Sequence, residues 1–337
     1  MKKLILFLLL ILIGCSEPEP LNYQLLIERD GVHYRKDTNE IYSGPIFNIE
    51  GRSEGTLKKG KFHGPFKSYH ENGQLSGEVT FKNGNADGPV KSYYFNGQLK
   101  QEGTFKNGKR DGLWKWYYDN GQLEREETYK DDTPDGLFKS YYENGQLEKE
   151  GTYKNGEQDG PFKIYFENGQ LEEDSTYKND EIDGPYTSYY ENGQLEKEGT
   201  FKNSKENGLF KLYHDNGQLK EESTYKDGKL DGPFKSYHDN GQLKEEGTYK
   251  TNQLYGKRDG PYKEYYENGQ LESETTYNNG ELDGPHKSYH ENGQLKVEQT
   301  FKDGKIDGLA KSYYDNGQLK EEGTFNNGKL DGPIKFY

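Results

Sequence analysis

The side chains that could carry out chemistry are few, and most of them recur at one place in a repeated pattern. Cys15 is the only thiol among 337 residues. Four of the seven histidines, His70, His214, His238 and His290, occupy a position that otherwise holds tyrosine or phenylalanine, so we interpret them as aromatic replacements. No Ser-His-Asp set, carboxylate pair or glycine-rich phosphate loop stands out. The Asp-Gly and Asn-Gly pairs lack the clustered oxygens of a calcium loop. The sequence therefore predicts no catalytic residues, no metal site, no cofactor and no enzymatic activity.

Cys15 follows an apolar segment at the start of the chain. Two lysines precede an unbroken apolar run from Leu4 to Ile13, and Gly14 comes directly before the cysteine. A helix of ten residues spans about 15 Å, half the hydrocarbon thickness of a bilayer, which is typical of a signal peptide and too short for a membrane span. The end of this run, Leu12 to Cys15, resembles a bacterial lipobox. The resemblance implies a lipoprotein signal peptide over residues 1–14 and acyl chains on Cys15; the alternative is an ordinary secretory signal.

Residues 15–40 are expected to hold the lipidated cysteine, a tether and an N-terminal cap. The segment Ser16 to Pro20 is acidic and proline-rich, as solvated tethers are. Ser16 differs from the aspartate of inner-membrane retention signals, and acidic residues after the cysteine resemble a surface-export signal, so we expect the outer membrane or the cell surface. Loss of Lys2 and Lys3 takes the formal net charge from −14 to about −16, which argues against binding nucleic acid. Membrane attachment would then come from the acyl chains alone.

A repeat dominates the rest of the chain. The tetrapeptide Asn-Gly-Gln-Leu occurs eleven times, first at Asn72 and last at Asn316, with a period of 24 residues. The one exception is a step of 28 residues between Asn240 and Asn268, which places four extra residues in the connector between Lys250 and Asp259. A fixed period in this range indicates an array of identical supersecondary units. We assign the array to residues 41–337.

Each repeat has the pattern of a β-hairpin. Two aromatic-rich runs with period 2 flank Asn240 and Gly241, which predicts a two-residue turn with positive φ at both residues, and a longer turn is expected between repeats. The predicted fold is all-β, an elongated, twisted, single-layer antiparallel β meander of about twelve 24-residue hairpins. A β-propeller is the alternative, because two repeats would make a four-stranded blade.

The predicted turn sets a cross-strand register. It places Lys235 opposite Glu246, Phe234 opposite Gly247, Tyr237 opposite Lys244 and His238 opposite Leu243. One face of the sheet is then aromatic and apolar, with Phe234 and Leu243 together, and the other is charged. The column of Phe66 also holds Val90, Trp114, Tyr186, His286 and Ala310, which predicts a loosely fitted position.

A column of tyrosines runs through the predicted charged face. Tyrosine offers apolar area and a hydroxyl at low entropy cost and is enriched where proteins bind each other. We therefore predict an interaction stripe, with rings that merely shield their cross-strand neighbours as the alternative. Its members are Tyr69, Tyr93, Tyr117, Tyr141, Tyr165, Tyr189, Tyr213, Tyr237, Tyr265, Tyr289 and Tyr313, with Tyr337 continuing the column.

The aromatic pair before Asn-Gly, the Gly-Thr-Tyr second strand and the Asp-Gly-Pro entry resemble the bacterial variant of the MORN repeat. The resemblance implies an antiparallel meander with one hairpin per repeat, and a role in interaction with a protein partner. Many bacterial proteins of this kind are antitoxin or immunity-like partners of a toxin, but a lipid anchor departs from a cytoplasmic antitoxin. We therefore expect an anchored, non-enzymatic protein-interaction scaffold, with an antitoxin or immunity protein as the first alternative. A cell-surface carbohydrate-binding module is the second, because Ser92, Tyr93 and Tyr94 resemble a choline-binding repeat, although only Trp114 and Trp116 could supply tryptophan to a cage.

Overall fold

The computed structural model describes residues 18–48, 51–251 and 256–337. The chain divides into two compact units, Met1–Asp135 and Gly136–Tyr337, which are called unit 1 and unit 2 here and are described one at a time. Cys15 and the predicted signal peptide of residues 1–14 lie outside the described residues, so lipidation stays a prediction. Within the described ranges, no helix has the length and apolar character needed to cross a membrane.

Unit 1 is an antiparallel sheet preceded by a separate hairpin. A short 3-10 helix, η1 (Tyr23–Leu25), leads into the hairpin of β2 (Leu26–Arg29) and β3 (Val32–Arg35). The sheet starts with β1 (Leu21–Asn22), which is parallel to β4 (Gly44–Phe47), and then follows chain order. Its further strands are β5 (Ser53–Lys58), β6 (Lys61–Phe62), β7 (Gly64–Tyr69), β8 (Leu75–Lys82), β9 (Asn85–Tyr93), β10 (Leu99–Lys106), β11 (Lys109–Arg110), β12 (Gly112–Tyr117) and β13 (Leu123–Lys130).

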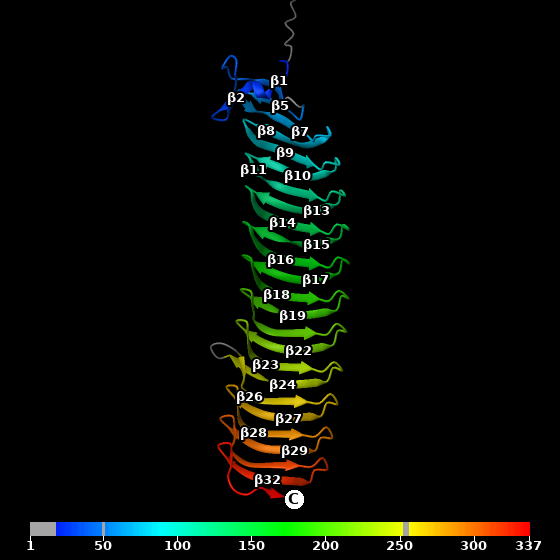
Figure 1. Cartoon of the computed structure of the whole chain (residues 1–337), viewed down its shortest axis with the longest axis vertical. Coiled ribbons are helices and arrows are strands. Elements are labelled where there is room, and N and C mark those ends of the chain that lie inside the picture. Colours follow the sequence, from blue (N-terminus) through cyan, green and yellow to red (C-terminus); the bar gives the residue numbers. More distant parts are fainter. Residues whose placement is uncertain (1–17, 49–50, 252–255) are drawn as a thin grey trace, which may run out of the picture. The chain divides into compact units, whose positions relative to one another are not determined.

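Unit 2 continues the same pattern, and its consecutive strands lie side by side (Figure 1). The order is linear and no pairing closes it into blades, so the predicted meander is confirmed and the propeller alternative is wrong for the described strands. Its first strand, β14 (Thr133–Tyr141), begins just before the unit. The others are β15 (Leu147–Lys154), β16 (Glu157–Tyr165), β17 (Leu171–Lys178), β18 (Glu181–Tyr189), β19 (Leu195–Lys202), β20 (Lys205–Glu206), β21 (Gly208–Tyr213), β22 (Leu219–Lys226), β23 (Lys229–Tyr237), β24 (Leu243–Thr251), β25 (Gly256–Arg258), β26 (Gly260–Tyr265), β27 (Leu271–Asn278), β28 (Glu281–Tyr289), β29 (Leu295–Lys302), β30 (Lys305–Ile306), β31 (Gly308–Tyr313), β32 (Leu319–Asn326), β33 (Lys329–Leu330) and β34 (Lys335–Phe336).

The Asn-Gly-Gln-Leu turn has one residue more than predicted. The His238 N–H donates to the Gln242 carbonyl at 2.8 Å, and the Gly241 N–H donates to the His238 carbonyl at 2.8 Å. Gly241 has a φ of 82°, whereas Asn240 is not among the residues with positive φ. These are the features of a three-residue loop built on a type I turn with a left-handed glycine at its end. The predicted two-residue turn at Asn240 and Gly241 is therefore wrong.

Asparagine is required in this loop for two hydrogen bonds. The Asn240 Oδ1 accepts from the Gln242 N–H at 2.9 Å, which closes an Asx turn. The Asn240 Nδ2 donates to the carbonyl of Glu267 in the next repeat at 2.8 Å. The same forward bond joins Asn144 to the Glu167 carbonyl at 3.1 Å. The asparagine side chain thus stabilises its own turn and links it to the corresponding turn of the next repeat.

The tight two-residue turns lie between the repeats, where the longer turn was expected. Asn155 and Gly156 have φ values of 53° and 91°, and the flanking Lys154 and Glu157 pair with each other. Positive φ at both central residues is the signature of a type I′ hairpin, which Asn-Gly favours. The two kinds of turn are therefore exchanged relative to the prediction.

The register of each hairpin is nevertheless correct away from the turn. Lys235 pairs with Glu246 and Phe234 with Gly247, as predicted. Near the turn Tyr237 pairs with Leu243, because Lys244 is an extra bulged residue. The bulge offsets the extra loop residue, so the strands return to the predicted register. The predicted pairs of Tyr237 with Lys244 and of His238 with Leu243 are wrong, and Leu243 shares the face of Tyr237.

The three best-buried aromatic side chains belong to the column of Phe66, which was predicted to be loosely fitted. Phe210 is 0% exposed, Tyr262 2% and Trp114 3%. Each of these rings lies over a glycine of the preceding strand, and a Cβ built on Gly199 would overlap the ring of Phe210. In these repeats the ring and the glycine beneath it fit closely, so the prediction of a loosely fitted position is wrong there.

The residue beneath the ring is not glycine in every repeat. Ser223 pairs with Phe234, and Thr275 pairs with the smaller His286. These rings also meet the aromatic residue at the end of the second strand, as when Phe210 and Tyr225 pack edge to face with centroids 5.5 Å apart. The core of the sheet is thus a row of aromatic contacts on one face.

The 28-residue step lengthens one connector without disturbing the sheet. β24 and β25 pair through Lys250 with Lys257 and through Thr251 with Gly256. The Thr251 hydroxyl donates to the Leu230 carbonyl at 2.9 Å. Residues 252–255, which complete this connector, lie outside the described residues.

The start of unit 1 has a core of its own. Leu26, Tyr42, Ile46 and Leu57 are buried together. His33 is also buried, and its Nδ1 donates to the Gly60 carbonyl at 2.8 Å. These contacts fix the β2–β3 hairpin against the first strands of the sheet.

Candidate interaction surface

The charged face of the sheet consists of the columns that contain Lys235, Tyr237, Glu246 and Thr248. Lysine and acid pair across most hairpins, as between Lys139 Nζ and Glu150 at 3.3 Å and between Lys163 Nζ and Asp174 at 3.5 Å, and Thr187 replaces the lysine in one hairpin. Exposed ion pairs of this kind contribute little to stability. Their main effect is to align the side chains of this face in rows.

Every tyrosine of the predicted stripe up to Tyr313 is half-buried on the charged face, whereas Tyr337 is exposed. The hydroxyls donate to a glutamate of the preceding repeat, as from Tyr213 to Glu198 Oε1 at 2.7 Å and from Tyr165 to Glu150 Oε1 at 2.8 Å. The same bond is present at Tyr69, Tyr117, Tyr237, Tyr265, Tyr289, Tyr313 and Tyr337. The stripe therefore links successive repeats, and only part of each ring is left for a partner.

Burial and these hydrogen bonds together favour the neutral form of the tyrosines. Burial, followed by the hydrogen bond to Glu198, raises the pKa of Tyr213 to about 12. The same two causes raise the pKa of Tyr165 to about 12, and the Tyr165 hydroxyl is the main cause that lowers the pKa of Glu150. A neutral phenol that already donates to a carboxylate is a poor nucleophile or base at neutral pH. The stripe is thus a packing and contact surface.

Tyr189 is a natural exception in this column. The residue at the place of the glutamate is Asp174, whose side chain is one methylene shorter and which pairs with Lys163 instead.

We expect Tyr213→Phe to lower the free energy of unfolding by about 1 kcal/mol, the contribution of one hydrogen bond. Tyr189→Phe, the matched control, should change it by much less. Chemical denaturation measures both, and equal losses would show that the hydroxyl bond does not stabilise the sheet.

Shallow pockets recur on the charged face at one position of the repeat. In unit 2 one cavity of about 160 Å³ lies between Leu137 and Pro161, with Thr152, Glu150 and Lys163 also lining it. A second, of about 190 Å³, is lined by the corresponding residues Pro261, Lys263, Glu274, Thr276, Pro285 and Lys287. A third, of about 180 Å³, adjoins it and is lined by Pro285, Lys287, Glu298, Thr300, Leu309 and Lys311. Each pocket thus has a proline or leucine from two successive repeats, a threonine floor and lysine stems.

The residues at the rims of these pockets were missed in the sequence. Leu137 is 63% exposed and Leu309 49% exposed. Both stand where other repeats have the proline of Asp-Gly-Pro. An exposed leucine in place of this proline was the available signal in the sequence.

The aromatic residue before each Asn-Gly turn joins neighbouring repeats. The Tyr190 hydroxyl donates to the Tyr213 carbonyl at 2.8 Å. His238 occupies the same column, and its Nε2 donates to the Tyr265 carbonyl at the same distance. An imidazole N–H can therefore replace the phenol O–H, which supports the interpretation of these histidines as aromatic replacements.

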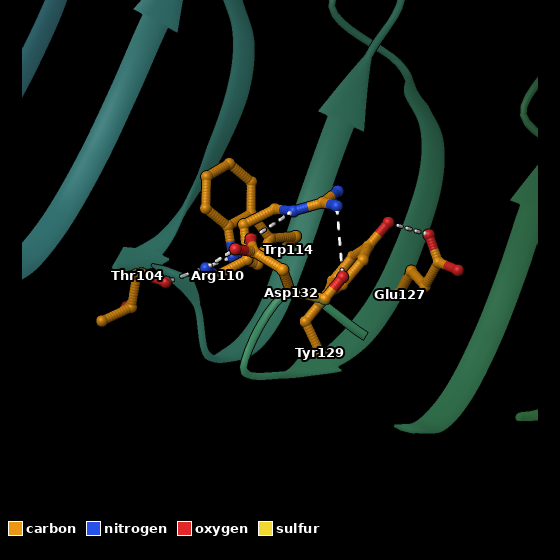
Figure 2. A network of polar contacts seen from close by, with 6 residues as sticks. All are labelled: Thr104, Arg110, Trp114, Glu127, Tyr129 and Asp132. Atoms are coloured by element: carbon orange, nitrogen blue, oxygen red, sulfur yellow. Dashed lines mark hydrogen bonds and ion pairs between the residues drawn. The ribbon is translucent and has the colours of Figure 1, made fainter. Parts of the chain in front are cut away.

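Trp114 belongs to a packed cluster in unit 1 (Figure 2), and the ring of Trp116 lies beside those of Trp114 and Tyr129. The Trp114 Nε1 donates to the Thr104 carbonyl at 3.2 Å, and its ring is buried. The Arg110 guanidinium lies 3.9 Å above the Tyr129 ring, and the Tyr129 hydroxyl donates to Glu127 at 2.5 Å. A buried Trp114 cannot form an open aromatic cage for a sugar or choline. The cluster thus stabilises the sheet. Within the described part of the chain, no group of three potential metal-ligating residues is present.

Comparison with known proteins finds one family. Its model, described as the MORN repeat variant, matches residues 62–83, 86–107, 110–131, 134–155, 158–179, 182–203, 206–227, 230–251, 258–279, 282–303 and 306–327. A comparison with curated proteins finds no significant match.

Matches among solved structures include toxin complexes. One is a crystal structure of TcdB2-TccC3-Cdc42, with 13% identity and a TM-score of 0.20, over 81% of this chain and 17% of the other. Another is the Tc holotoxin pore of Photorhabdus luminescens, with 14% identity and a TM-score of 0.20 over the same shares. The chain therefore spans 17% of the length of either protein, and these scores carry no conclusion about fold or function.

Proposed function

Because this chain belongs to the MORN repeat variant family, we propose that it is a non-enzymatic scaffold that binds a protein partner and is anchored to the cell envelope. The recurrence of the same pockets on the charged face is the observation that carries the proposal. Exposed leucines such as Leu137 make these pockets partly apolar, and partly apolar, concave surfaces suit binding. The function comes from this surface and not from the repeat alone.

The binding part of the proposal can be tested by photo-crosslinking in intact cells. A benzophenone amino acid in place of Leu137 should give a covalent adduct with a protein, because this side chain lies at the rim of a pocket. The same amino acid at Leu25, which is 54% exposed in unit 1, serves as the control. Absence of an adduct specific to Leu137 would refute the scaffold. A toxin as the crosslinked protein would make the immunity alternative correct.

The anchor is the second part of the proposal. The apolar run that ends at Gly14 and the position of the single cysteine support acylation of Cys15, with the outer membrane or the cell surface as the destination. One acyl chain binds a membrane only marginally, so stable attachment needs more than one. In this proposal the acyl chains are the sole contact with the membrane.

Replacement of Cys15 tests the anchor. We expect Cys15→Ala to move the protein out of the membrane fraction or to leave it with its signal peptide uncleaved, because no other residue offers a thiol. Ser16→Ala, which keeps the thiol, should still be acylated and stay with the membrane. Incorporation of labelled fatty acid and membrane fractionation measure the two effects. A wild-type protein that takes up no label would exclude lipidation.

A further inference from the structure

Three pockets of the charged face in unit 2 occupy the same position of the repeat, and two of them are neighbours. Each pocket takes its rim from the proline or leucine of two successive repeats, and the pockets at Pro261 and Pro285 share a wall. One repeat contributes two strands, and strands lie about 4.8 Å apart, so equivalent points recur about every 9.6 Å across the sheet. A ligand that fills several pockets must have a similar period along its length.

A polyproline II helix has this period. It rises about 3.1 Å per residue with three residues per turn, so every third residue recurs after about 9.3 Å. The difference of about 0.3 Å per repeat accumulates to only about 1 Å over four repeats. We propose that the charged face of unit 2 binds a proline-rich segment of its protein partner as a polyproline II helix, with one proline in each pocket. This inference rests on the proposed scaffold function and names the partner's chemistry.

The lining of the pockets suits such a segment. A proline ring can pack between Leu137 and Pro161 and against the stem of Lys163. Backbone carbonyls of a polyproline II helix have no internal hydrogen bonds and need donors. Lysine ammonium groups have three donors each, and Lys139 directs its ammonium to Glu150 at 3.3 Å, which leaves donor capacity for a peptide carbonyl. The pocket thus offers apolar walls to the ring and a donor to the backbone.

Unit 1 contains a proline-rich segment of this chain beside an equivalent pocket. The cavity there has a volume of about 820 Å³, and Glu19 and Pro20 line it together with Pro45, Thr56 and Pro65. Pro45 pairs with Thr56, as the rim proline of other repeats pairs with its threonine. An acidic, proline-containing segment therefore already borders one site of this kind in the folded chain, which favours a peptide as the occupant over a sugar.

Peptides of defined period test the proposal. Fluorescein-labelled peptides of three and six Pro-Pro-Gln triplets are titrated into the full-length chain, and binding is followed by fluorescence anisotropy. We expect six triplets to bind at least about tenfold more tightly than three, because more pockets are occupied at once. A peptide of the same length made of Pro-Pro-Gln-Gln units should bind at least about tenfold more weakly than six triplets, because its period does not match the sheet. Equal affinity of the two long peptides, or no binding, would overturn the proposal.

Variants at the pocket rims locate the site. The double variant Leu137→Glu and Leu309→Glu should weaken binding of the six-triplet peptide at least about tenfold with an unchanged melting temperature, since both side chains are exposed. Leu25→Glu in unit 1 is the control and should bind as the wild type does. Equal weakening by both variants would contradict the assigned site.

Two further results separate this inference from the scaffold function. Crosslinking at Leu137 without any binding of the triplet peptides would leave the scaffold function intact and refute the polyproline segment. Binding of a β-linked glucan hexasaccharide at the pockets, in place of the peptides and without a protein adduct, would refute both.

Discussion

Gly199→Ala is expected to lower the free energy of unfolding by about 2 kcal/mol, although it adds a single methyl group. The Cβ would overlap the ring of Phe210, which is fully buried. The backbone of Gly199 is not in the left-handed region, so the loss comes from the overlap alone. Chemical denaturation of the purified protein measures the loss.

A matched glycine and a compensating variant complete this test. A Cβ on Gly323 would lie 3.3 Å from the flexible end of Leu330, so Gly323→Ala should change stability much less. In the double variant of Gly199→Ala with Phe210→Ala the ring is gone, and the loss should be smaller than the sum of the single losses by at least about 1 kcal/mol. Additive losses would mean that ring and glycine do not contact each other as described.

Deletion of one whole repeat should leave a folded protein, whereas deletion of half a repeat should not. Removal of residues 208–231 joins Asn207 to Gly232 and restores the same connector. It also places Phe234 over Gly199, where Phe210 lies now. Removal of residues 208–219 takes away one strand, so every later strand would run in the opposite direction.

Circular dichroism and thermal melting distinguish the two deletions. The protein without residues 208–231 should keep its β spectrum and melt within a few degrees of the wild type, because its repeats and joints are unchanged in kind. The protein without residues 208–219 should lose cooperative melting. The same melting curve for both would contradict the hairpin as the repeating unit.

The sequence predicts the strands of this protein better than its turns. Alternating aromatic and polar residues around Asn240 indicate two strands, and the opposite charges of Lys235 and Glu246 identify their register. Asn-Gly, however, is compatible both with a type I′ turn and with a type I turn that ends in a left-handed glycine. The bulge at Lys244 compensates for the difference between these turns. The alternation of residues farther from the turn is therefore the same for both turn types and does not distinguish them.

The core was misjudged because each column was considered alone. Variation from tryptophan to alanine in the column of Phe66 suggests a loose fit, yet the residue beneath it also varies between repeats. Gly199 lies beneath the ring of Phe210. In another repeat Gln299 occupies the position of Gly199, and Ala310 occupies the position of Phe210. A tight fit between two varying columns becomes visible only when the strand pairing is known.

The tyrosine stripe was correctly placed on one face, but its hydroxyl partners were not predicted. Tyr213 reaches Glu198 in the preceding repeat, a contact that depends on how neighbouring hairpins align. The pockets beside it form between two repeats and have no local sequence pattern. The position of the stripe could thus be derived from alternation within a strand, whereas the shape of the surface depends on the packing of whole repeats.

The forward hydrogen bond of the turn asparagine has a consequence for the evolution of the array. The acceptor is a backbone carbonyl, which belongs to Phe95 in one joint, to Glu167 in another and to Asp315 in a third. The side chain of the acceptor residue can therefore be substituted without loss of the hydrogen bond between the two repeats. When a repeat is copied or lost by unequal recombination, the repeat that then follows still has a backbone carbonyl at the acceptor position. The gene can change its number of repeats in whole steps, and selection can adjust the reach of the protein without redesigning the contacts within it.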